Sequence, residues 1–318
     1  MTSERLEQPM FRHRTVLRQE AVDQLFTDPD GVYVDCTLGG AGHSACILER
    51  LSAKGRLIGF DQDPQAIENA RLLFAADPRF TLIHSNFANL KENLQKRDFF
   101  PVDGLLFDLG VSSPQLDEAE RGFSYMQDAR LDMRMDPGSS LTAAEIVNVW
   151  SEEEIARIIW QYGEENWSRR IAQRIVQARE KQPLTGTGEL VEVIKAAIPA
   201  AARRSGPHPA KRTFQALRIA VNDELGVLDR ALDQIPDCLD ADGRLAIITF
   251  HSLEDRLVKG KMREWAGKCL CPPGLPICSC GKKALMNIIT RKPILPTAQE
   301  VEMNPRSRSA KLRVAAKI

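Results

Sequence analysis

Apolar and polar residues follow two different patterns in the first third of the chain. Short runs rich in branched apolar residues predict buried β-strands, because such residues favour a pleated, half-buried conformation. The segments between the runs repeat apolar residues at helical spacing, and one helix is expected to begin at Pro64 behind the capping residue Asp63. Strands that alternate with helices predict an α/β fold with a doubly wound, Rossmann-like parallel sheet. The expected strands lie near residues 32–35, 56–63, 80–84 and 102–110, and two further helices near 43–55 and 88–98.

The alternation is interrupted in the middle of the chain. Residues 142 to about 199 carry helix signals and no convincing strand, including a capping box formed by Ser151 and Glu154. We therefore expect an inserted, mainly helical domain at 116–205 that divides the sheet domain into 1–115 and 206–318. The alternation resumes with a long helix from about 209 to 235, a strand at 243–250, a helix from 253 and a last strand near the C-terminus.

Composition indicates an ordinary globular protein. Of the 318 residues, 43% are hydrophobic and 27% are charged, and no apolar run is long enough to cross a membrane or to form the core of a signal peptide. The seven cysteines are odd in number and unevenly spread, which argues against a secreted disulfide framework. We expect a soluble, cytoplasmic protein with reduced thiols and no membrane segment.

Charge is distributed unevenly, although the net charge is zero. Residues 201–318 contain 21 Lys and Arg but only 12 Asp and Glu, so the first 200 residues are correspondingly acidic. A basic region can neutralise phosphates, which favours a nucleic acid as the partner. The stretch 203–218 and the C-terminal segment 304–313 contribute much of this positive charge.

The turn after the first expected strand is rich in glycine, and this points to a nucleotide-type cofactor. Gly39, Gly40 and Gly42 let backbone amides approach a ligand closely. Asp61 follows Gly42 at about the offset at which an acidic residue accepts hydrogen bonds from ribose hydroxyls. Ribose occurs in both NAD and S-adenosylmethionine, and residues 40–45 loosely match the dinucleotide pattern, so these residues alone leave both cofactors open.

The end of the fourth expected strand favours methyl transfer over hydride transfer. Asp108 can accept a hydrogen bond from a polar group, and Ser112, Ser113 and Pro114 form a rigid polar rim beside it. Such a loop suits an exocyclic amine, whose lone pair is delocalised into its ring. Acceptors for the N–H groups help to localise that lone pair while the nitrogen is held in line with a methyl sulfonium.

Ten sequence blocks, in matching order over nearly the whole chain, resemble the bacterial MraW family of small-subunit ribosomal RNA methyltransferases. The resemblance implies S-adenosylmethionine-dependent N4-methylation of a cytidine in the decoding region of that RNA, with the ribosomal RNA or the small ribosomal subunit as partner. It also implies a cofactor site. The blocks include "VDCTLGGAGHS", "DQDPQAI", "DLGVSSPQLD", "RGFSY", "RTFQALRIAVNDEL", "FHSLEDR" and "NPRSRSAKLR", and the cofactor residues carried over are Ala41, Gly42, His43, Asp61, Phe87, Asp108 and Gln115.

Physical reasoning agrees with most of these assignments. Asp61 suits the ribose. Phe87 is expected to pack on the adenine, although without the resemblance core packing is the favoured interpretation of this phenylalanine. His43 fits both a cofactor contact and a simple position at a helix N-terminus. Asp108 and Ser113 are the expected catalytic residues beside the amine, and Gln115 adds a polar contact near the methionine end.

The substrate side is less defined by sequence. An extruded base is normally read by ring stacking, for which Phe123, Tyr125 and Phe250 are candidates, each with core packing as the alternative. His251 follows the fifth expected strand, where a hydrogen-bonding or structural role fits better than that of a general base, which methyl transfer does not require. The pair Ala129–Arg130 departs from the family, whose members carry Gly-Pro there, and a homodimer remains open.

Four cysteines form two C-x-C pairs, Cys269 with Cys271 and Cys278 with Cys280. Their thiolates suit a structural zinc ion as well as a surface loop with free thiols, and the methyl-transfer mechanism needs no metal. Three rival functions also remain. They are a nicotinamide-dependent dehydrogenase, a noncatalytic RNA-binding assembly factor, and an amino-methyltransferase that acts on DNA.

Overall fold

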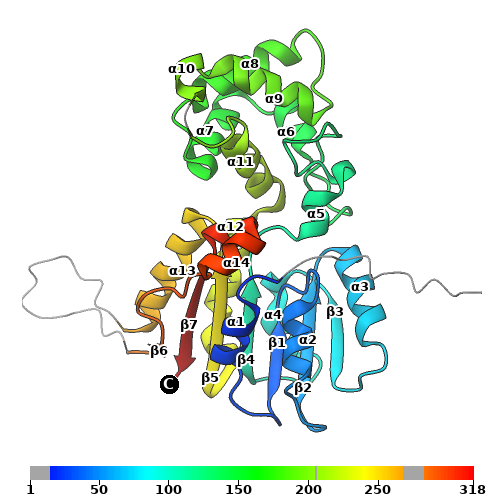
Figure 1. Ribbon diagram of the computed structural model, residues 1–318, viewed down its shortest axis with the longest axis vertical. Helices are drawn as coiled ribbons and strands as arrows, with labels where there is room; N and C mark the ends of the chain where they lie inside the picture. The colour runs from blue at the N-terminus through cyan, green and yellow to red at the C-terminus, as the bar shows by residue number, and fades with distance from the viewer. Residues whose placement is uncertain (1–14, 205, 268–282) are drawn as a thin grey trace, which may run out of the picture.

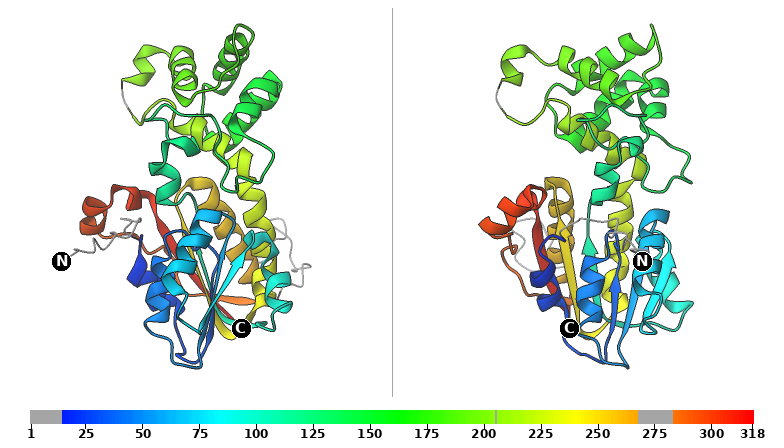
Figure 2. Two further views of the ribbon diagram at one scale, coloured as in Figure 1. Left: turned by 90° about the vertical axis from the view of Figure 1, so that its right-hand side faces the viewer. Right: turned by 45° about the vertical axis from the view of Figure 1, so that its right-hand side comes forward.

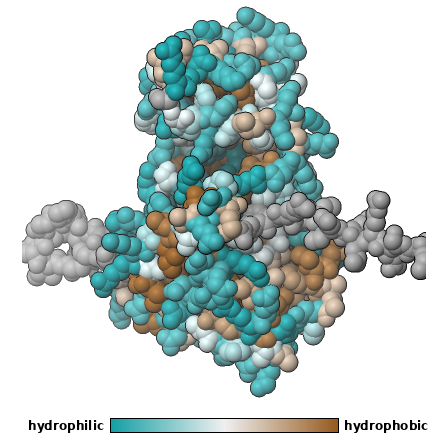
Figure 3. All heavy atoms as spheres, viewed as in Figure 1, coloured by the Kyte–Doolittle hydropathy of each residue, from teal (hydrophilic) through white to brown (hydrophobic). Residues whose placement is uncertain are grey.

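The computed structural model describes residues 15–204, 206–267 and 283–318. An α/β unit forms the lower part of the molecule and a helical unit lies above it (Figure 1). The described part of the chain contains no helix that is both long enough and apolar enough to span a membrane. The surface is mainly hydrophilic on the helical unit and carries scattered hydrophobic patches on the α/β unit (Figure 3).

A seven-stranded sheet forms the centre of the α/β unit, in the order β3-β2-β1-β4-β5-β7-β6. Strands β1 to β5 run parallel, whereas β7 runs antiparallel to both of its neighbours. The strand order reverses between β1 and β4, which is where ligands bind in open α/β sheets. The bounds are β1 Val32–Asp35, β2 Arg56–Asp61, β3 Phe80–His84, β4 Val102–Asp108, β5 Leu239–Thr249, β6 Met286–Ile288 and β7 Lys311–Lys317.

Helices cover both faces of this sheet, so the doubly wound Rossmann-like fold is confirmed. Apolar side chains of α1 and α2 pack on one face against β1, β4, β5 and β7. Side chains of α4, α12 and α13 pack on the other face. The helices are α1 Arg18–Leu25, α2 Gly42–Leu48, α3 Pro64–Phe74, α4 Leu90–Gln95, α12 Glu224–Cys238, α13 Ser252–Trp265 and α14 Ala298–Met303, with short 3₁₀ turns η1 Phe87–Asn89 and η3 Pro305–Ser309.

The helical unit stands apart from the sheet in both views of Figure 2 and has a hydrophobic core of its own, built from residues between Phe123 and Val221. Ser151 and Glu154 form the expected capping box, in which each side chain bonds the backbone of the other residue. The unit contains α6 Ala143–Val149, α7 Glu152–Gly163, α8 Ser168–Arg179, α9 Thr187–Ala197, α10 Ala200–Arg203 and α11 Lys211–Asn222, and it is reached through α5 Ser113–Asp117 and η2 Ala119–Arg121.

The expected single helix over 209–235 is wrong, because two helices occupy this stretch. Asp223 separates α11 from α12 and adopts a left-handed conformation with φ of 46°. The break lets α11 pack in the helical unit while α12 packs on the sheet. The inserted domain at 116–205 therefore stays a proposal, and the packing of α11 favours a second boundary near Asp223. Sequence reasoning also missed α1 and the three-residue strand β6.

Candidate active site at the carboxyl edge of the sheet

A cavity of about 720 Å³ lies where the helical unit meets the carboxyl ends of β1, β2, β4 and β5. This volume is in the range of small-molecule and cofactor sites. Both units contribute to its wall, and the space-filling view is hollowed at this level (Figure 3). The cavity brings together most of the residues expected from sequence, namely Gly42, His43, Asp61, Phe87, Asp108, Ser113 and Gln115.

The glycine-rich turn is held from two sides. Ala41 does not line the cavity; it is 1% exposed and caps α2 in a left-handed conformation. Gly42 does line it, but its lack of a side chain is required by the protein itself, since a Cβ there would lie 1.8 Å from the Thr15 hydroxyl oxygen. The amide of Gly39 donates to Asp61 Oδ2 over 2.9 Å and fixes the turn to the end of β2.

Among the residues that the structure describes, only backbone amides donate to Asp61. Its second oxygen accepts from the amide of Asp63 over 2.8 Å. Burial, offset by these hydrogen bonds and reinforced by the nearby charges of Asp63 and Asp35, raises the pKa of Asp61 to about 6. Each carboxylate oxygen can accept more than one hydrogen bond, so Asp61 retains acceptor capacity toward hydroxyl donors in the cavity.

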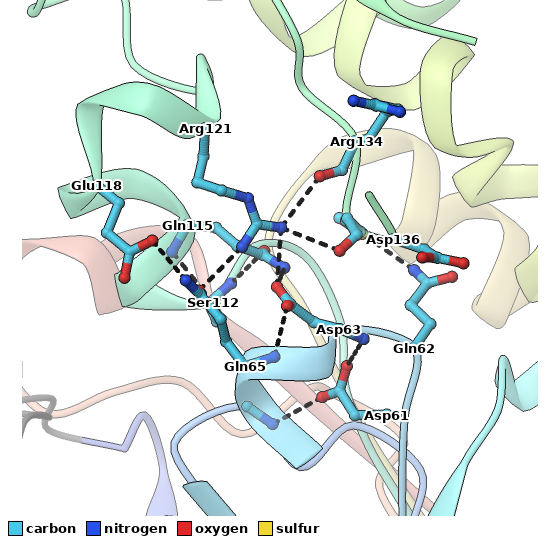
Figure 4. Close-up of polar contacts among 12 residues, drawn as sticks. Asp61, Gln62, Asp63, Gln65, Ser112, Gln115, Glu118, Arg121, Arg134 and Asp136 are labelled. Atoms are coloured by element: carbon cyan, nitrogen blue, oxygen red, sulfur yellow. Dashed lines mark hydrogen bonds and ion pairs between the residues drawn. The ribbon is translucent and has the colours of Figure 1, made fainter. Parts of the chain in front are cut away.

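Asp63 forms a buried network that joins the two units (Figure 4). Its Oδ1 caps α3 through the amide of Gln65, as expected, and its Oδ2 accepts from Gln115 Nε2 over 2.8 Å and from Arg121 over 2.9 Å. The Gln115 carbonyl oxygen in turn accepts from the amide of Ser112 over 3.0 Å. Both ends of Gln115 are therefore held by the protein, and its expected contact with a cofactor stays a prediction.

Asp108 lies at the end of β4 and borders the same cavity. Its Oδ1 is buried and accepts no hydrogen bond from the described residues, while its Oδ2 lies 3.7 Å from His43 Nδ1. Burial, together with the negative charges of Asp35 and Glu254, raises the pKa of Asp108 well above its usual value. A buried carboxyl oxygen without a donor is costly to the protein, which is typical of a group that bonds a ligand.

His43 and Ser113 are each fixed by a second contact. The His43 ring is buried, with Nε2 3.2 Å from the Val16 carbonyl oxygen. The Ser113 hydroxyl accepts from Arg306 over 2.8 Å, and Arg306 also forms an ion pair with Asp117. Arg306 belongs to the basic C-terminal segment and lines the cavity. Sequence reasoning assigned it to phosphate contact only, because nothing local predicts a bond to a serine so distant in the chain.

The four candidate rings differ in what they face. Phe87 lines the cavity and packs edge-on against Phe107 of the sheet core, so both of its expected roles are compatible with its position. Phe123 is 6% exposed within the helical core. Tyr125 stacks on His208 with ring centres 4.7 Å apart. Phe250 faces Gly110; a Cβ added at this glycine would lie 3.6 Å from the ring.

His251 caps α13 and belongs to an ionic cluster. Its Nδ1 accepts from the amide of Glu254 over 3.4 Å, and its Nε2 lies 3.0 Å from Glu254 Oε1. Burial alone would raise the pKa of Glu254, but His251 and the charge of Arg218 hold that pKa below its usual value. These contacts suit the structural, hydrogen-bonding role that sequence favoured, which stays a prediction because no described residue forms a hydrogen bond with the buried Nε2.

The same cluster has the donor set of a metal site, but an arginine already occupies one of its two carboxylates. Glu224, His251 and Glu254 bring ligand atoms within 4.8 Å of one another. Arg218 binds both carboxylate oxygens of Glu224, at 2.7 and 2.8 Å, so that a cation would have to displace a guanidinium.

The two C-x-C pairs lie outside the described residues. Cys36, Cys46 and Cys238 are buried free thiols.

Comparison with known proteins identifies the family. Residues 10–318 match the MraW methylase family. The chain belongs to the MraW methylase family. Curated relatives named ribosomal RNA small subunit methyltransferase H include that of Brevibacillus brevis, 59% identical over 309 residues, which are 97% of this chain and 98% of the relative. That of Clostridioides difficile is 57% identical over 309 residues, 97% of this chain and 99% of the relative.

Solved structures resemble this MraW methylase less closely. One, described as a putative rRNA-methylase from Clostridium thermocellum, has a TM-score of 0.45 and 12% identity, with coverage of 97% of this chain and 100% of that chain. The cofactor of this MraW methylase is S-adenosylmethionine. The cavity fits this cofactor, because it offers free acceptor capacity at Asp61, an aromatic ring at Phe87 and an unsatisfied carboxyl oxygen at Asp108.

Proposed function

We propose that this protein transfers the methyl group of S-adenosylmethionine to N4 of a cytidine in the decoding region of small-subunit ribosomal RNA. The observation that carries the proposal is the buried, unsatisfied carboxyl oxygen of Asp108 in the cavity between the two units. Relatives are named ribosomal RNA small subunit methyltransferase H, which supports small-subunit ribosomal RNA as the substrate class.

In this proposal the sheet edge binds the cofactor. Asp61, held by two backbone amides, accepts from the ribose hydroxyls, and Phe87 packs against the adenine. Gly42 and its neighbour Ala41 shape the turn, while His43 and Gln115 fix the walls near the methionine end. When bound, S-adenosylmethionine supplies an electrophilic methyl group on a positively charged sulfur.

Asp108 and Ser113 act on the acceptor in this proposal. Asp108 accepts a hydrogen bond from the exocyclic amine, which localises the nitrogen lone pair. The Ser113 hydroxyl already accepts from Arg306, so its own hydrogen remains available to an acceptor on the base. Two fixed contacts hold the amine in line with the methyl group, and such positioning supplies much of the catalysis in a reaction that needs no covalent intermediate.

The helical unit and the basic segments hold the RNA in this proposal. Lys211 and Arg306 line the cavity. Arg203, the last residue of α10, and the adjacent Arg204 are exposed. These cations can bind phosphates without reading sequence. Phe250 is the ring best placed to stack on an extruded cytosine, because it faces Gly110 next to the end of β4.

The experiment that tests the proposal follows a labelled methyl group. The protein and labelled S-adenosylmethionine are incubated with small ribosomal subunits that lack the modification, or with the corresponding bare RNA, and the nucleosides are identified by mass spectrometry with fragmentation. We expect N4-methylcytidine at one position, and the preferred substrate shows whether assembled structure is required. No incorporation into either substrate, despite measurable cofactor binding, would refute the proposed acceptor and favour a noncatalytic RNA-binding role or a DNA substrate.

Two carboxylate variants serve as a matched pair in this assay. Asp108→Asn removes the negative charge and one of the two acceptor oxygens at the reacting centre, and it is expected to lower transfer at least a hundredfold, the usual effect of removing one preorganised electrostatic contact. Asp237→Asn removes an exposed carboxylate at the far end of α12, where it pairs with Lys91, and is expected to leave transfer unchanged. Near-normal transfer by a folded Asp108→Asn protein would contradict the placement of the amine.

A further inference from the structure

The carboxyl group of Asp108 sits among groups that oppose its ionisation. Asp35 on β1 and Glu254 on α13 place negative charges near it. Its own backbone amide donates to the Thr37 hydroxyl over 2.6 Å, and its Oδ1 accepts no hydrogen bond from the described residues. Two arginines that line the cavity with Asp108 are already engaged with other carboxylates, Arg218 with Glu224 and Arg306 with Asp117. A neutral carboxylic acid fits these surroundings better than a carboxylate.

The orientation of His43 defines where the proton can go. The Val16 carbonyl oxygen can only accept a hydrogen bond, so His43 Nε2, 3.2 Å away, carries a hydrogen. In the neutral ring Nδ1 is then the acceptor nitrogen, and it lies 3.7 Å from Asp108 Oδ2. A lone pair facing a carboxylate oxygen is repulsive, whereas one proton between the two atoms is stabilising. Such pairs are commonly long without substrate and shorten in the reacting complex.

We infer that Asp108 and His43 form a pair that releases one proton when the positively charged cofactor binds. In the free protein the pair holds the proton on Asp108. Arrival of the sulfonium cation of S-adenosylmethionine favours the carboxylate, and the proton leaves to solvent. The ionised Asp108 is then ready to accept a proton from the acceptor, which by the proposed function is an amine.

The chemical step balances in charge. The amine nitrogen attacks the methyl carbon, so that an N–C bond forms while the C–S bond breaks and its electron pair stays on sulfur. The nitrogen then loses one proton to Asp108, where His43 Nδ1 can share it. Before the step the cavity holds a cationic sulfur and a carboxylate, and afterwards it holds a neutral thioether and a neutral acid. The net charge of the buried site stays constant, which avoids the cost of creating an uncompensated charge there.

Binding measurements test the exchange without any RNA. Calorimetric titrations with S-adenosylmethionine and with S-adenosylhomocysteine, each in two buffers of different ionisation enthalpy, give the number of protons released. Below the pKa of Asp108 we expect binding of S-adenosylmethionine to release about one more proton than binding of S-adenosylhomocysteine. The affinity for S-adenosylmethionine relative to that for S-adenosylhomocysteine should then rise by up to roughly tenfold per pH unit. Equal proton release by both ligands would overturn the inference, whatever the outcome of the methylation assay.

Three variants assign the proton to the pair. Asp108→Asn, shown by circular dichroism to be folded, should lose the difference between the ligands, whereas Asp237→Asn should retain it. A difference that persists in Asp108→Asn belongs to the ligands or to another group and overturns the inference. His43→Gln can keep the contact to the Val16 carbonyl but lacks an acceptor at Nδ1, so the pH midpoint of the affinity ratio should move down. An unchanged or raised midpoint would remove His43 from the pair.

Discussion

Replacement of Arg121 by methionine is expected to destabilise the junction of the two units strongly. Arg121 lies at the end of η2 and reaches Asp63, whose side chain is 4% exposed. The same guanidinium donates to the carbonyl oxygens of Arg134 and Met135, over 3.1 and 3.0 Å, and to the Gln65 side chain over 3.0 Å. Methionine preserves the apolar stem but leaves the Asp63 carboxylate without its cation and two carbonyl groups without a donor (Figure 4).

The expected cost follows from the burial of the pair. Removal of one partner from a buried ion pair typically costs about 3–5 kcal/mol, against a total stability of about 5–15 kcal/mol for a typical protein. A matched control is Arg71→Met, since Arg71 pairs with Glu68 on the exposed side of α3, where both side chains are more than half exposed. That change should cost less than about 1 kcal/mol. Urea unfolding followed by circular dichroism measures both free energies.

Two results would refute this reasoning. The first is a cost for Arg121→Met within about 1 kcal/mol of the cost for Arg71→Met, because the buried network would then contribute no more than a surface pair. The second comes from adding Asp63→Asn to Arg121→Met. Neutralising the orphaned carboxylate should recover part of the loss, so strictly additive costs would show that the two side chains are not energetically coupled.

Four further substitutions have defined outcomes. Gly42→Ala should lower the free energy of unfolding by about 1–3 kcal/mol, because the new Cβ clashes with Thr15. Its control is Gly260→Ala in the middle of α13, where a Cβ contacts nothing and should raise the free energy of unfolding by up to about 1 kcal/mol. Thermal melts of the two variants test both predictions. Burial raises the pKa of Asp35 to about 6, so its contribution to stability is present below about pH 4 and is lost as the pH rises through about 6. Asp35→Asn should therefore gain stability relative to the parent protein across that window, which melts at several pH values would show. Phe250→Leu should raise the KM for RNA and leave cofactor affinity unchanged, and a weakened cofactor affinity instead would place this ring on the cofactor.

Sequence predicted the features that local patterns encode. The capping roles of Asp63 and Ser151 are confirmed, because both depend on residues within one helical turn. The strands β1 to β4 are likewise confirmed within a few residues at each end. The break at Asp223 was missed because neither glycine nor proline marks it, and α11 and α12 share one helical pattern until tertiary packing separates them.

The candidate site was predicted at the level of its residues but not of their contacts. Sequence placed Asp61 and Asp108 each at the end of a strand, and the topology, with β1 between these two strands, brings both to one cavity. It did not predict that Gln115 would bond Asp63 or that Ser113 would bond Arg306, which is separated from it by 193 positions. Such contacts depend on the complete fold, so periodicity and spacing carry no signal for them.

The break at Asp223 has a mechanical consequence. The chain passes between the sheet and the helical unit twice, once through α5 and η2 and once at Asp223. A body tethered at two separate points cannot swivel freely; its easiest movement is a rotation about the line that joins the tethers, as a door turns on two hinges. The network around Asp63 and the exposed ion pair between Glu164 and Arg256 also join the units, so this rotation would have to break them.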